Sequence, residues 1–583
     1  MVDYKVSNKV FGKCVTQKVK MRQDKMKVKA FDKRKYKASF WLLLVFLLAQ
    51  NLYSQEKDRG YLTGSLDVNA NVFIKDSSIN AFGLPQYERQ FFGGESWLNL
   101  QYNIGTLTAG IRYDMFINSN LRNPNDSYSD QGIGRWYMKK SFDKLDIQAG
   151  YIYDQIGSGI IYRSYETRPL FIDNSLLGAS VNYKFSDRFN IKGFAGKQKD
   201  AFDIYQGTIK GLNSELYNSF GEENPLTLLT GIGFIHKTIS DDAMERVVNS
   251  LKSYLPVDRF GPVYNSYAYS LYNTLSYKAV TWYVEGALKS RDIFYNPDAQ
   301  KLEPSGASTF GKYEFKRGSV LYSSLSFSLG NLSMTLEGKR TENFSFRIDP
   351  NLRLLRGYIS YIPPMNRQNT YRLPARYAPF TQELSEQAFQ IDAKYRWSKK
   401  FQTNLNVSAI NTLQNVKLYR EIYFENTFKP NTNWNFTFGV QNVQYNQNIY
   451  EQKPDAGIVK TIVPFTDILY KISNKKSIRW EAQYMSTQQD FGSWLYSLIE
   501  VGLAPSWIFE TSIMYNVDPK RTLVGAIKPE KILYPTLGVT YSKDVNRLQI
   551  KYVKQVEGIV CSGGICRLEP AFSGVRFTLS SQL

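Results

Sequence analysis

Charged side chains recur at every second position in many short segments of this chain, opposite a face of apolar residues. Side chains of both signs on one face can solvate a water-filled passage or pair with one another. We therefore interpret them as candidates to line a polar lumen, and their mixed sign argues against a strongly cation-selective or anion-selective pore. These candidates are Arg112, Asp114, Glu285, Lys289, Glu337, Lys339, Lys394, Arg396, Arg479 and Glu481.

Groups suited to catalysis or metal binding are scarce. The 583-residue chain has 1 His and 3 Cys. His236 lies on the apolar phase of Ile232 and Phe234, and a lone His at a membrane interface is a weak candidate for a catalytic base. Along the expected barrel wall, Glu and Asp occur singly, and residues 126–130 lack the Gly and the final Glu of a calcium loop. We predict no enzyme activity, no catalytic residue, no metal and no cofactor, with a lipid hydrolase that uses His236 as a remote alternative.

Two of the cysteines stand close together near the C-terminus. Cys561 and Cys566 enclose Ser-Gly-Gly-Ile, and such a pair outside the cytoplasm suggests a disulfide. The spacing is not the CxxC of thiol exchangers, and a zinc site would need more ligands. We therefore predict a disulfide that pins an exposed hairpin tip.

The segments that carry the charged residues have a period of two. Residues 62–74 illustrate it, because Leu66, Val68 and Val72 alternate with polar residues, as in a half-buried strand. Aromatic residues make up 15% of the chain, with 42 Tyr and 36 Phe, and they favour β structure. Outside the N-terminus no apolar run approaches the roughly 20 residues of a membrane-spanning helix. These features predict an all-β protein.

Short turns and long connections alternate along the chain. The long connections are expected at residues 75–95, 118–133, 154–175, 291–317 and 341–385. Outer-membrane barrels have this asymmetry, with short periplasmic turns and long external loops. We predict a large single-chain transmembrane antiparallel β-barrel of about 24 strands, with a range of 22 to 26. The least certain segment is a strand at 202–212 followed by a periplasmic turn at 213–227.

A barrel of this size needs something to fill its bore, because barrels of 16–18 strands already hold a water channel. Two long connections combine charged, aromatic, Gly and Pro residues, which favours packing inside the bore over free surface loops. A helix at 240–255, capped by Ser240 or Asp241, is expected on the rim, with a lid or plug inside the lumen as the alternative. The candidates in the two loops are Arg163, Glu166, Arg168, Asp173, Tyr361, Tyr371 and Tyr377.

The N-terminus has the pattern of an export signal. A long stretch rich in Lys and Arg precedes the apolar run at residues 40–49 and the small residues Ala49 and Ser54. We predict a cleaved signal peptide at residues 1–54 and an outer-membrane β-barrel at residues 55–583. The predicted location is the outer membrane of a Gram-negative bacterium.

The segments Gly157-Ser-Gly-Ile-Ile-Tyr-Arg163 and Thr370-Tyr-Arg-Leu373, together with the tip between Cys561 and Cys566, resemble a family of Bacteroidota outer-membrane barrels catalogued as a domain of unknown function. The resemblance spans the exported chain and implies fold and location, but no activity. The chain has Asn369 where this family often has His, so no role of an imidazole is implied here.

These features predict a loop-occluded conduit or porin-like channel for an unidentified solute. The alternative is a non-conducting barrel that docks exported or surface proteins. The expected partners are outer-membrane lipid, the barrel-assembly machinery and an unknown periplasmic or surface protein. Nucleic acid is not expected as a partner.

Overall fold

The computed structural model describes residues 60–582, apart from 224, 304, 354–355, 454–455, 523–527 and 563–564, and without the side chains of 559–568. The predicted signal peptide, residues 1–54, lies outside the described residues. The description below concerns the described part of the chain.

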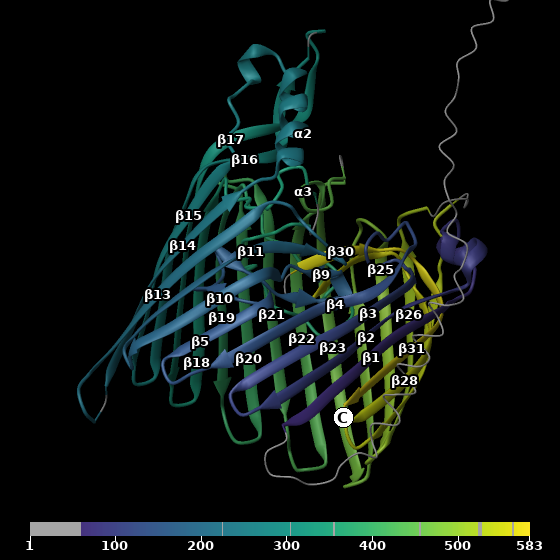
Figure 1. Ribbon diagram of the computed structural model, residues 1–583. Coiled ribbons are helices and arrows are strands. Elements are labelled where there is room, and N and C mark those ends of the chain that lie inside the picture. Colours follow the sequence, from purple (N-terminus) through teal and green to yellow (C-terminus); the bar gives the residue numbers. More distant parts are fainter. Residues whose placement is uncertain are drawn as a thin grey trace, which may run out of the picture. The chain divides into compact units, whose positions relative to one another are not determined.

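A closed antiparallel barrel of 24 strands makes up this part of the chain (Figure 1). Its strands are β1 (Tyr61–Phe73), β2 (Phe92–Ile104), β3 (Leu107–Ser119), β4 (Tyr128–Ser141), β5 (Leu145–Ile152), β10 (Leu176–Ser186), β11 (Phe189–Asp200), β13 (Thr208–Phe220), β14 (Leu226–Thr238), β15 (Asn265–Tyr277), β16 (Val280–Leu302), β17 (Ser308–Leu329), β18 (Leu332–Glu342), β19 (Ser385–Arg396), β20 (Phe401–Asn411), β21 (Lys417–Phe428), β22 (Trp434–Asn446), β23 (Ile458–Ser473), β24 (Lys476–Met485), β25 (Gly492–Leu503), β26 (Trp507–Pro519), β27 (Leu533–Lys543), β28 (Asn546–Gln555) and β31 (Phe572–Gln582).

The first and last strands close the barrel. β1 and β31 pair antiparallel from Ser65 opposite Gln582 to Phe73 opposite Gly574, and every other barrel strand pairs with the barrel strand before and after it. A closed ring leaves no free sheet edge. The predicted fold class and the predicted number of strands are confirmed.

One predicted boundary is wrong. The strand expected at 202–212 is β13, at Thr208–Phe220, and the turn expected at 213–227 shrinks to residues 221–225. Asn213 and Glu215 lie in the segment that was expected to be this turn. They point into the barrel instead, where Tyr272 donates its hydroxyl hydrogen to them.

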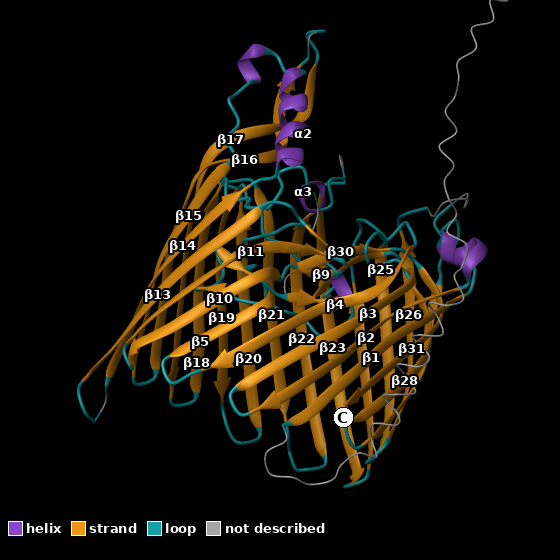
Figure 2. Ribbon diagram, in the orientation of Figure 1, coloured by secondary structure: helices purple, strands orange, loops and turns teal. Residues whose placement is uncertain are grey.

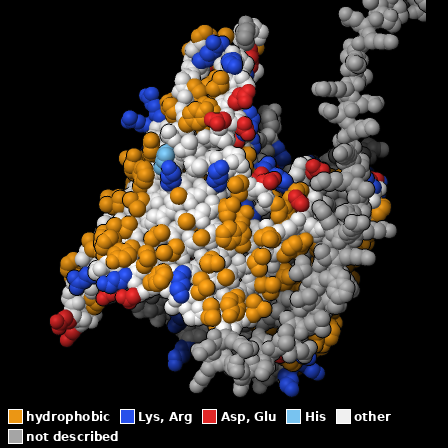
Figure 3. Space-filling view, in the orientation of Figure 1, with side chains coloured by type: hydrophobic (Ala, Val, Ile, Leu, Met, Phe, Trp, Pro, Cys, Tyr) orange, Lys and Arg blue, Asp and Glu red, His pale blue; other side chains and the backbone are white. Residues whose placement is uncertain are grey.

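Side chains alternate between the two faces of the wall. On β15, Ala268 and Tyr272 are buried inside the barrel, whereas Tyr269 and Leu271 are exposed outside it. In Figure 3, apolar side chains are spread over the exterior of the barrel, and Lys, Arg, Asp and Glu gather mainly toward its upper and lower ends. A polar interior and an apolar exterior are the pattern of a barrel immersed in lipid.

Glycines on the inner wall make room for aromatic rings from neighbouring strands. A Cβ placed on Gly231 would lie 2.0 Å from Cζ of Tyr272, the residue directly opposite on β15. The same relation joins Gly211 to Phe194 and Gly439 to Phe465. Overpacking at such a contact forces a ring out of its place.

The Gly231→Ala variant is therefore expected to destabilise the barrel by about 1–3 kcal/mol. Chemical unfolding of the refolded protein in detergent micelles would measure the change in the free energy of unfolding. Gly286→Ala on β16 is the matched control, because a Cβ there meets no atom within 4 Å. Equal stability of the two variants would contradict the steric argument.

The β16–β17 hairpin extends beyond the rim and carries the main helix (Figure 2). Helix α2 (Asp241–Lys252) is capped by Ser240, whose Oγ accepts from the Ala243 N–H at 3.2 Å. Met244 and Val247 bury their side chains in one cluster with Ile293 and Tyr313 of the hairpin. The helix therefore packs on the external hairpin, as the rim interpretation expects.

The remaining helical turns and short strands belong to connections. They are η2 (Ser77–Ile79), η3 (Gln86–Gln90), β6 (Gln155–Ile156), β7 (Tyr162–Arg163), β8 (Glu166–Thr167), η4 (Arg168–Leu170), β9 (Ile172–Asp173), β12 (Asp203–Ile204), η5 (Pro256–Asp258), α3 (Gln447–Tyr450), β29 (Gly558–Ser562) and β30 (Ile565–Glu569). Among the described residues, none of the helices has the length and apolar character needed to cross a membrane.

Candidate functional site in the barrel lumen

Two connections contact inward-facing side chains on widely separated strands. We call residues 153–175, between β5 and β10, the first lumen loop, and residues 343–384, between β18 and β19, the second lumen loop. The first reaches Asp67 on β1 and Glu285 on β16. The second reaches Lys289 on β16 and Gln483 on β24. Together the two loops cross the bore.

Arg112 on β3 is the centre of an ion-pair network that holds the first lumen loop. Its guanidinium lies 2.6 Å from Asp114, 2.7 Å from Glu166 and 3.1 Å from Asp173. Lys199 on β11 adds a second cation, 2.5 Å from Asp173. Arg112 and Asp114 are buried, so each charge has exchanged water for fixed partners of opposite sign.

Asp173 shows the electrostatic effect of this network. Burial by itself would raise the pKa of its carboxyl group, but the neighbouring Lys199 and Arg112 lower that pKa to about 2. The Tyr153 hydroxyl also donates to Asp173, at 2.8 Å. Asp173 is therefore ionised at neutral pH, and it binds the loop to two strands at once.

Further contacts of the first lumen loop extend to both sides of this network. Arg168 pairs with Asp67 on β1 at 2.7 Å and lies over the ring of Trp97 on β2. On the opposite side, Ser158 donates from its backbone N–H and its hydroxyl to Glu285 at 2.9 and 2.6 Å. The loop is thus attached to the wall at several places, and does not hang from its two ends alone.

The two lumen loops also bind each other. The N–H of Arg163 donates to the carbonyl of Ile359, and the N–H of Tyr361 donates to the carbonyl of Gly159, both at 2.9 Å. The guanidinium of Arg163 lies 4.2 Å from the centre of the Tyr361 ring, within cation–π range. The loops therefore form one unit in the bore.

Polar contacts attach the second lumen loop to the part of the wall formed by β18, β21 and the β24–β25 connection. Lys339 on β18 donates to the carbonyl of Pro363 at 2.6 Å and pairs with Glu386 on β19 at 2.8 Å. Asn369 donates to Glu421 on β21 at 3.2 Å. Tyr377 donates to Asp490, in the β24–β25 connection, at 2.9 Å.

The interior of this assembly is also apolar in part. Ile160 and Ile161 of the first loop and Met365 and Leu373 of the second belong to one buried cluster with the wall residue Trp494. Tyr371 packs on Phe465 with ring centres 4.5 Å apart and approaches Asp467 at 3.5 Å. The loops are therefore packed against the wall as a protein core is.

The remaining wall candidates divide into one that binds a loop, three that bind within the wall and two that are exposed. Lys289 donates to the Ser345 carbonyl of the second loop at 2.6 Å. Glu337 accepts from Tyr322, and Arg479 pairs with Asp467 and Glu481. Lys394 and Arg396 are exposed near the short turn that ends β19, away from both loops.

Several partners were not anticipated from the sequence. They are Asp67, Lys199, Asp292, Glu386, Glu421 and Asp490. Asp67, Glu386 and Glu421 lie on the inward phase of their strands, which was the available signal. Asp292 lies inward only because the register shifts between Lys289 and Asp292. Which of them meet a loop depends on the path of the loop through the bore, and the period of two carries no information on that path.

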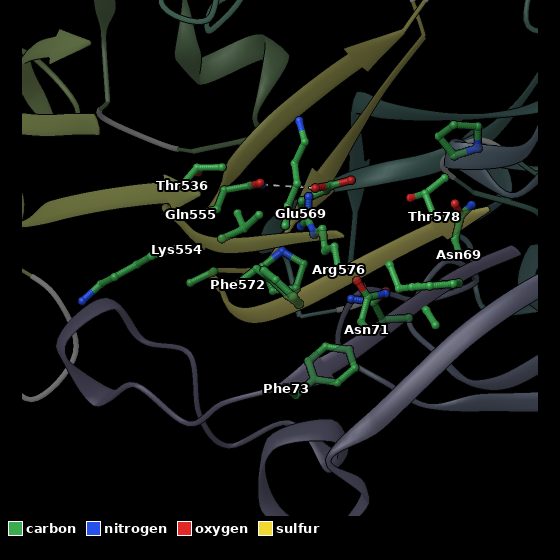
Figure 4. Close-up of a pocket in the computed structure, with 18 of the residues that line it drawn as sticks. Asn69, Asn71, Phe73, Thr536, Lys554, Gln555, Glu569, Phe572, Arg576 and Thr578 are labelled. Atoms are coloured by element: carbon green, nitrogen blue, oxygen red, sulfur yellow. Dashed lines mark hydrogen bonds between the residues drawn. The ribbon is translucent and has the colours of Figure 1, made fainter. Parts of the chain in front are cut away.

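A cavity remains on one side of the loops. It has a volume of about 480 Å³ and lies against β1, β25–β28 and β31, with Arg168 and Arg372 of the loops on its border. Figure 4 shows Asn69, Asn71, Thr536, Gln555, Arg576 and Thr578 around it. The lining is therefore mixed, because apolar wall residues such as Met514 and Val553 and the rings of Phe73 and Phe572 lie beside the polar side chains.

The predicted disulfide falls on residues whose side chains lie outside the described residues. The backbone of β29 and β30 sets Cys561 opposite Cys566 in an antiparallel ladder. The disulfide remains a prediction. In the part of the chain that the structure describes, no group of three or more His, Cys, Asp or Glu residues is arranged to hold a metal ion.

A comparison with protein families identifies the family of this chain. A model described as a family of unknown function, DUF6029, matches residues 35–583. The chain belongs to this family. The name DUF6029 carries no activity, which agrees with the resemblance to an uncharacterised family. No curated protein matches the chain.

Solved structures share a general likeness with this DUF6029 chain. The siderophore receptor PirA from Pseudomonas aeruginosa is 9% identical, with a TM-score of 0.37, over 91% of this chain and 81% of that one. The translocation pore of the P pilus usher PapC is 8% identical, with a TM-score of 0.39, over 89% and 99%. OccAB4 from Acinetobacter baumannii is 10% identical, with a TM-score of 0.31, over 68% and 97%. These identities and TM-scores are too low to carry a function over to this chain.

Proposed function

We propose that this DUF6029 protein is a loop-occluded conduit for a small polar solute in the outer membrane of a Gram-negative bacterium, within the Bacteroidota. The cavity of about 480 Å³ between the loops and the wall carries the proposal. Neutral polar side chains and ion pairs such as Lys551–Glu510 line it together with apolar residues, and the polar part of the lining suits a water-filled path. The apolar exterior supports the membrane location, and the barrel-assembly machinery is the expected route of insertion.

Narrowing the cavity tests the proposed path. Thr578 is exposed to the cavity on β31, so Thr578→Trp is expected to lower the single-channel conductance at least about twofold, because an indole occupies much of such a space. Planar-bilayer recording of the purified barrel measures the effect. Leu579→Trp is the matched control, since the next residue of the strand points to lipid. Equal conductance of the two variants would rule out this path.

A non-conducting docking barrel is the second candidate. The β16–β17 hairpin and α2 have a small core of their own beyond the rim, and Val257 and Phe310 are exposed there. Such a projection suits binding of a periplasmic or surface protein, and the hairpin lies at the long-loop end, which favours a surface partner. Silent bilayers from both the wild-type barrel and a barrel without its second lumen loop would favour this function.

We infer no catalytic role for His236. The Nε2 atom of His236 lies 3.1 Å from Oδ1 of Asn265, and the imidazole stacks on Tyr267 with ring centres 5.0 Å apart. A hydrolase would need the imidazole to activate a nucleophile. The Thr238 hydroxyl lies 3.4 Å from Nε2 of His236, but it donates to Asn265 at 2.7 Å. These contacts suit a side chain of the membrane interface.

A further inference from the structure

An open groove of about 730 Å³ lies on the outer surface of the barrel, on β15–β18. Its apolar and aromatic border is formed by Tyr267, Tyr269 and Leu288, all of them exposed. Phe234 and His236 on β14 stack beside the two tyrosines. Aromatic side chains gather in this way at the level of lipid head groups.

Two arginines stand where the strands leave this aromatic level. In the β16–β17 ladder, Lys289 pairs with Gly318 and Asp292 pairs with Lys316. Between these two pairs, Ser290 and Arg291 of β16 lie opposite Arg317 alone, which makes a β-bulge. Residues 280–289 of β16 precede this β-bulge, which matches the roughly 9–11 residues with which a tilted strand crosses a bilayer. The bulge therefore places Arg291 and Arg317 at the expected membrane surface, on the side of the long loops.

Hydrogen bonds hold the bulge in shape. Ser290 Oγ accepts from the Tyr267 N–H at 2.9 Å and donates to the Arg291 carbonyl at 3.2 Å. A β-bulge redirects the side chains of its strand. Here it brings the exposed Arg291 and Arg317 into the lining of one groove.

The charges around the groove are paired, except for these two. Glu342 pairs with Arg340 at 2.8 Å, and Lys316 with Glu314 at 2.7 Å. Lys289 points inward, where it lies 3.4 Å from Asp292. Within the described ranges, neither Arg291 nor Arg317 has an ion-pair or hydrogen-bond partner for its guanidinium. The guanidinium of Arg291 lies 6.0 Å from the centre of the Phe315 ring. The groove therefore presents two guanidinium groups without an anionic partner above an apolar floor.

We propose that this groove binds the phosphorylated headgroup of an outer-leaflet lipid. A guanidinium forms paired, charge-assisted hydrogen bonds with phosphate oxygens. The acyl chains would lie along the apolar wall below, over Leu271 and Leu321, which are exposed on the same strands. The inference rests on the proposed membrane location, but not on conduction through the barrel.

Lipid A is a suitable probe, because it can be compared with its dephosphorylated form. Native mass spectrometry of the detergent-purified full chain would measure lipid binding across a titration. We expect the double variant Arg291→Gln/Arg317→Gln to bind lipid A at least about tenfold more weakly than the wild type, which corresponds to about 1.4 kcal/mol. Dephosphorylated lipid A should bind the wild type as weakly as lipid A binds this variant.

The double variant Lys399→Gln/Lys400→Gln is the matched control. It also removes two exposed positive charges, but in a short turn at the other end of the barrel, and it should bind lipid A like the wild type. Should Arg291→Gln/Arg317→Gln fail to fold, Arg291→Lys/Arg317→Lys keeps both charges and is still expected to bind more weakly, because lysine cannot form the paired bonds.

Three results would overturn the proposal. They are equal lipid A binding by the arginine variant and the wild type, equal loss in the lysine control, and displacement of lipid A by millimolar inorganic phosphate, which would indicate a site for a soluble anion. Conductance of the arginine variant separates this inference from the proposed function, because it should equal that of the wild type whether or not the lipid binds.

Discussion

Deletion of residues 358–382, with residues 357 and 383 joined by a short Gly-Ser linker, is expected to raise the single-channel conductance of the purified barrel roughly tenfold or more, since barrels of fewer strands already hold an aqueous channel. The deletion removes the contacts of Asn369 with Glu421 and of Tyr377 with Asp490. It also removes Leu373 from the buried cluster in the bore. The half of the lumen beside β21–β25 should then fill with water.

The comparison needs a deletion of external chain as its control. Removal of residues 298–310, at the tip of the β16–β17 hairpin, takes away part of the projection beyond the rim (Figure 1). It should leave the conductance unchanged. If the two deletions have the same effect, the second lumen loop does not obstruct the bore.

Substitution of Arg112 by Met is expected to lower the free energy of unfolding by about 3–5 kcal/mol, the usual cost of removing one partner from a buried ion pair. Arg112 faces Asp114, Glu166 and Asp173. Without it, Asp114 and Asp173 would have only Lys199 as a cationic partner, and Glu166 would have only Arg168, at 3.4 Å. The first lumen loop should loosen from β3 as a result. Chemical unfolding in micelles measures the loss.

Arg122→Met is the control for this substitution. Arg122 lies 3.4 Å from Asp200, and its side chain is 33% exposed. Exposed ion pairs contribute about 0–1 kcal/mol, so this variant should remain close to the wild type. A similar loss of unfolding free energy in both variants would mean that the buried network around Arg112 contributes no more to stability than the exposed ion pair of Arg122.

The fold could be predicted from the sequence because each barrel strand obeys one local rule. Lipid outside and polar groups inside impose alternation on every strand, as on residues 62–74. Glu215 shows the limit of this rule, because a polar residue in the middle of β13 can be assigned either to an inward-facing position or to a turn. Only its partner Tyr272, on another strand, distinguishes the two.

The candidate site was less predictable for a physical reason. Alternation assigns Arg112 to the interior, but its contacts with Glu166 and Asp173 join residues far apart in the chain. The composition of the first lumen loop suggested packing, but it did not specify that Ser158 would bind Glu285 on β16. The same limit applies to the lipid groove, because a β-bulge at Ser290 and Arg291 leaves little trace in the alternation.

The central claim is that both lumen loops are docked inside the bore, and hydrogen–deuterium exchange of the wild-type protein tests it most directly. The amides of Arg163 and Tyr361 donate to the opposite loop, and hydrogen-bonded amides in a packed interior exchange slowly. We predict that peptides covering residues 158–163 and 359–362 exchange as slowly as those of the barrel strands. Exchange as fast as in the exposed turn at residues 397–400 would contradict the claim.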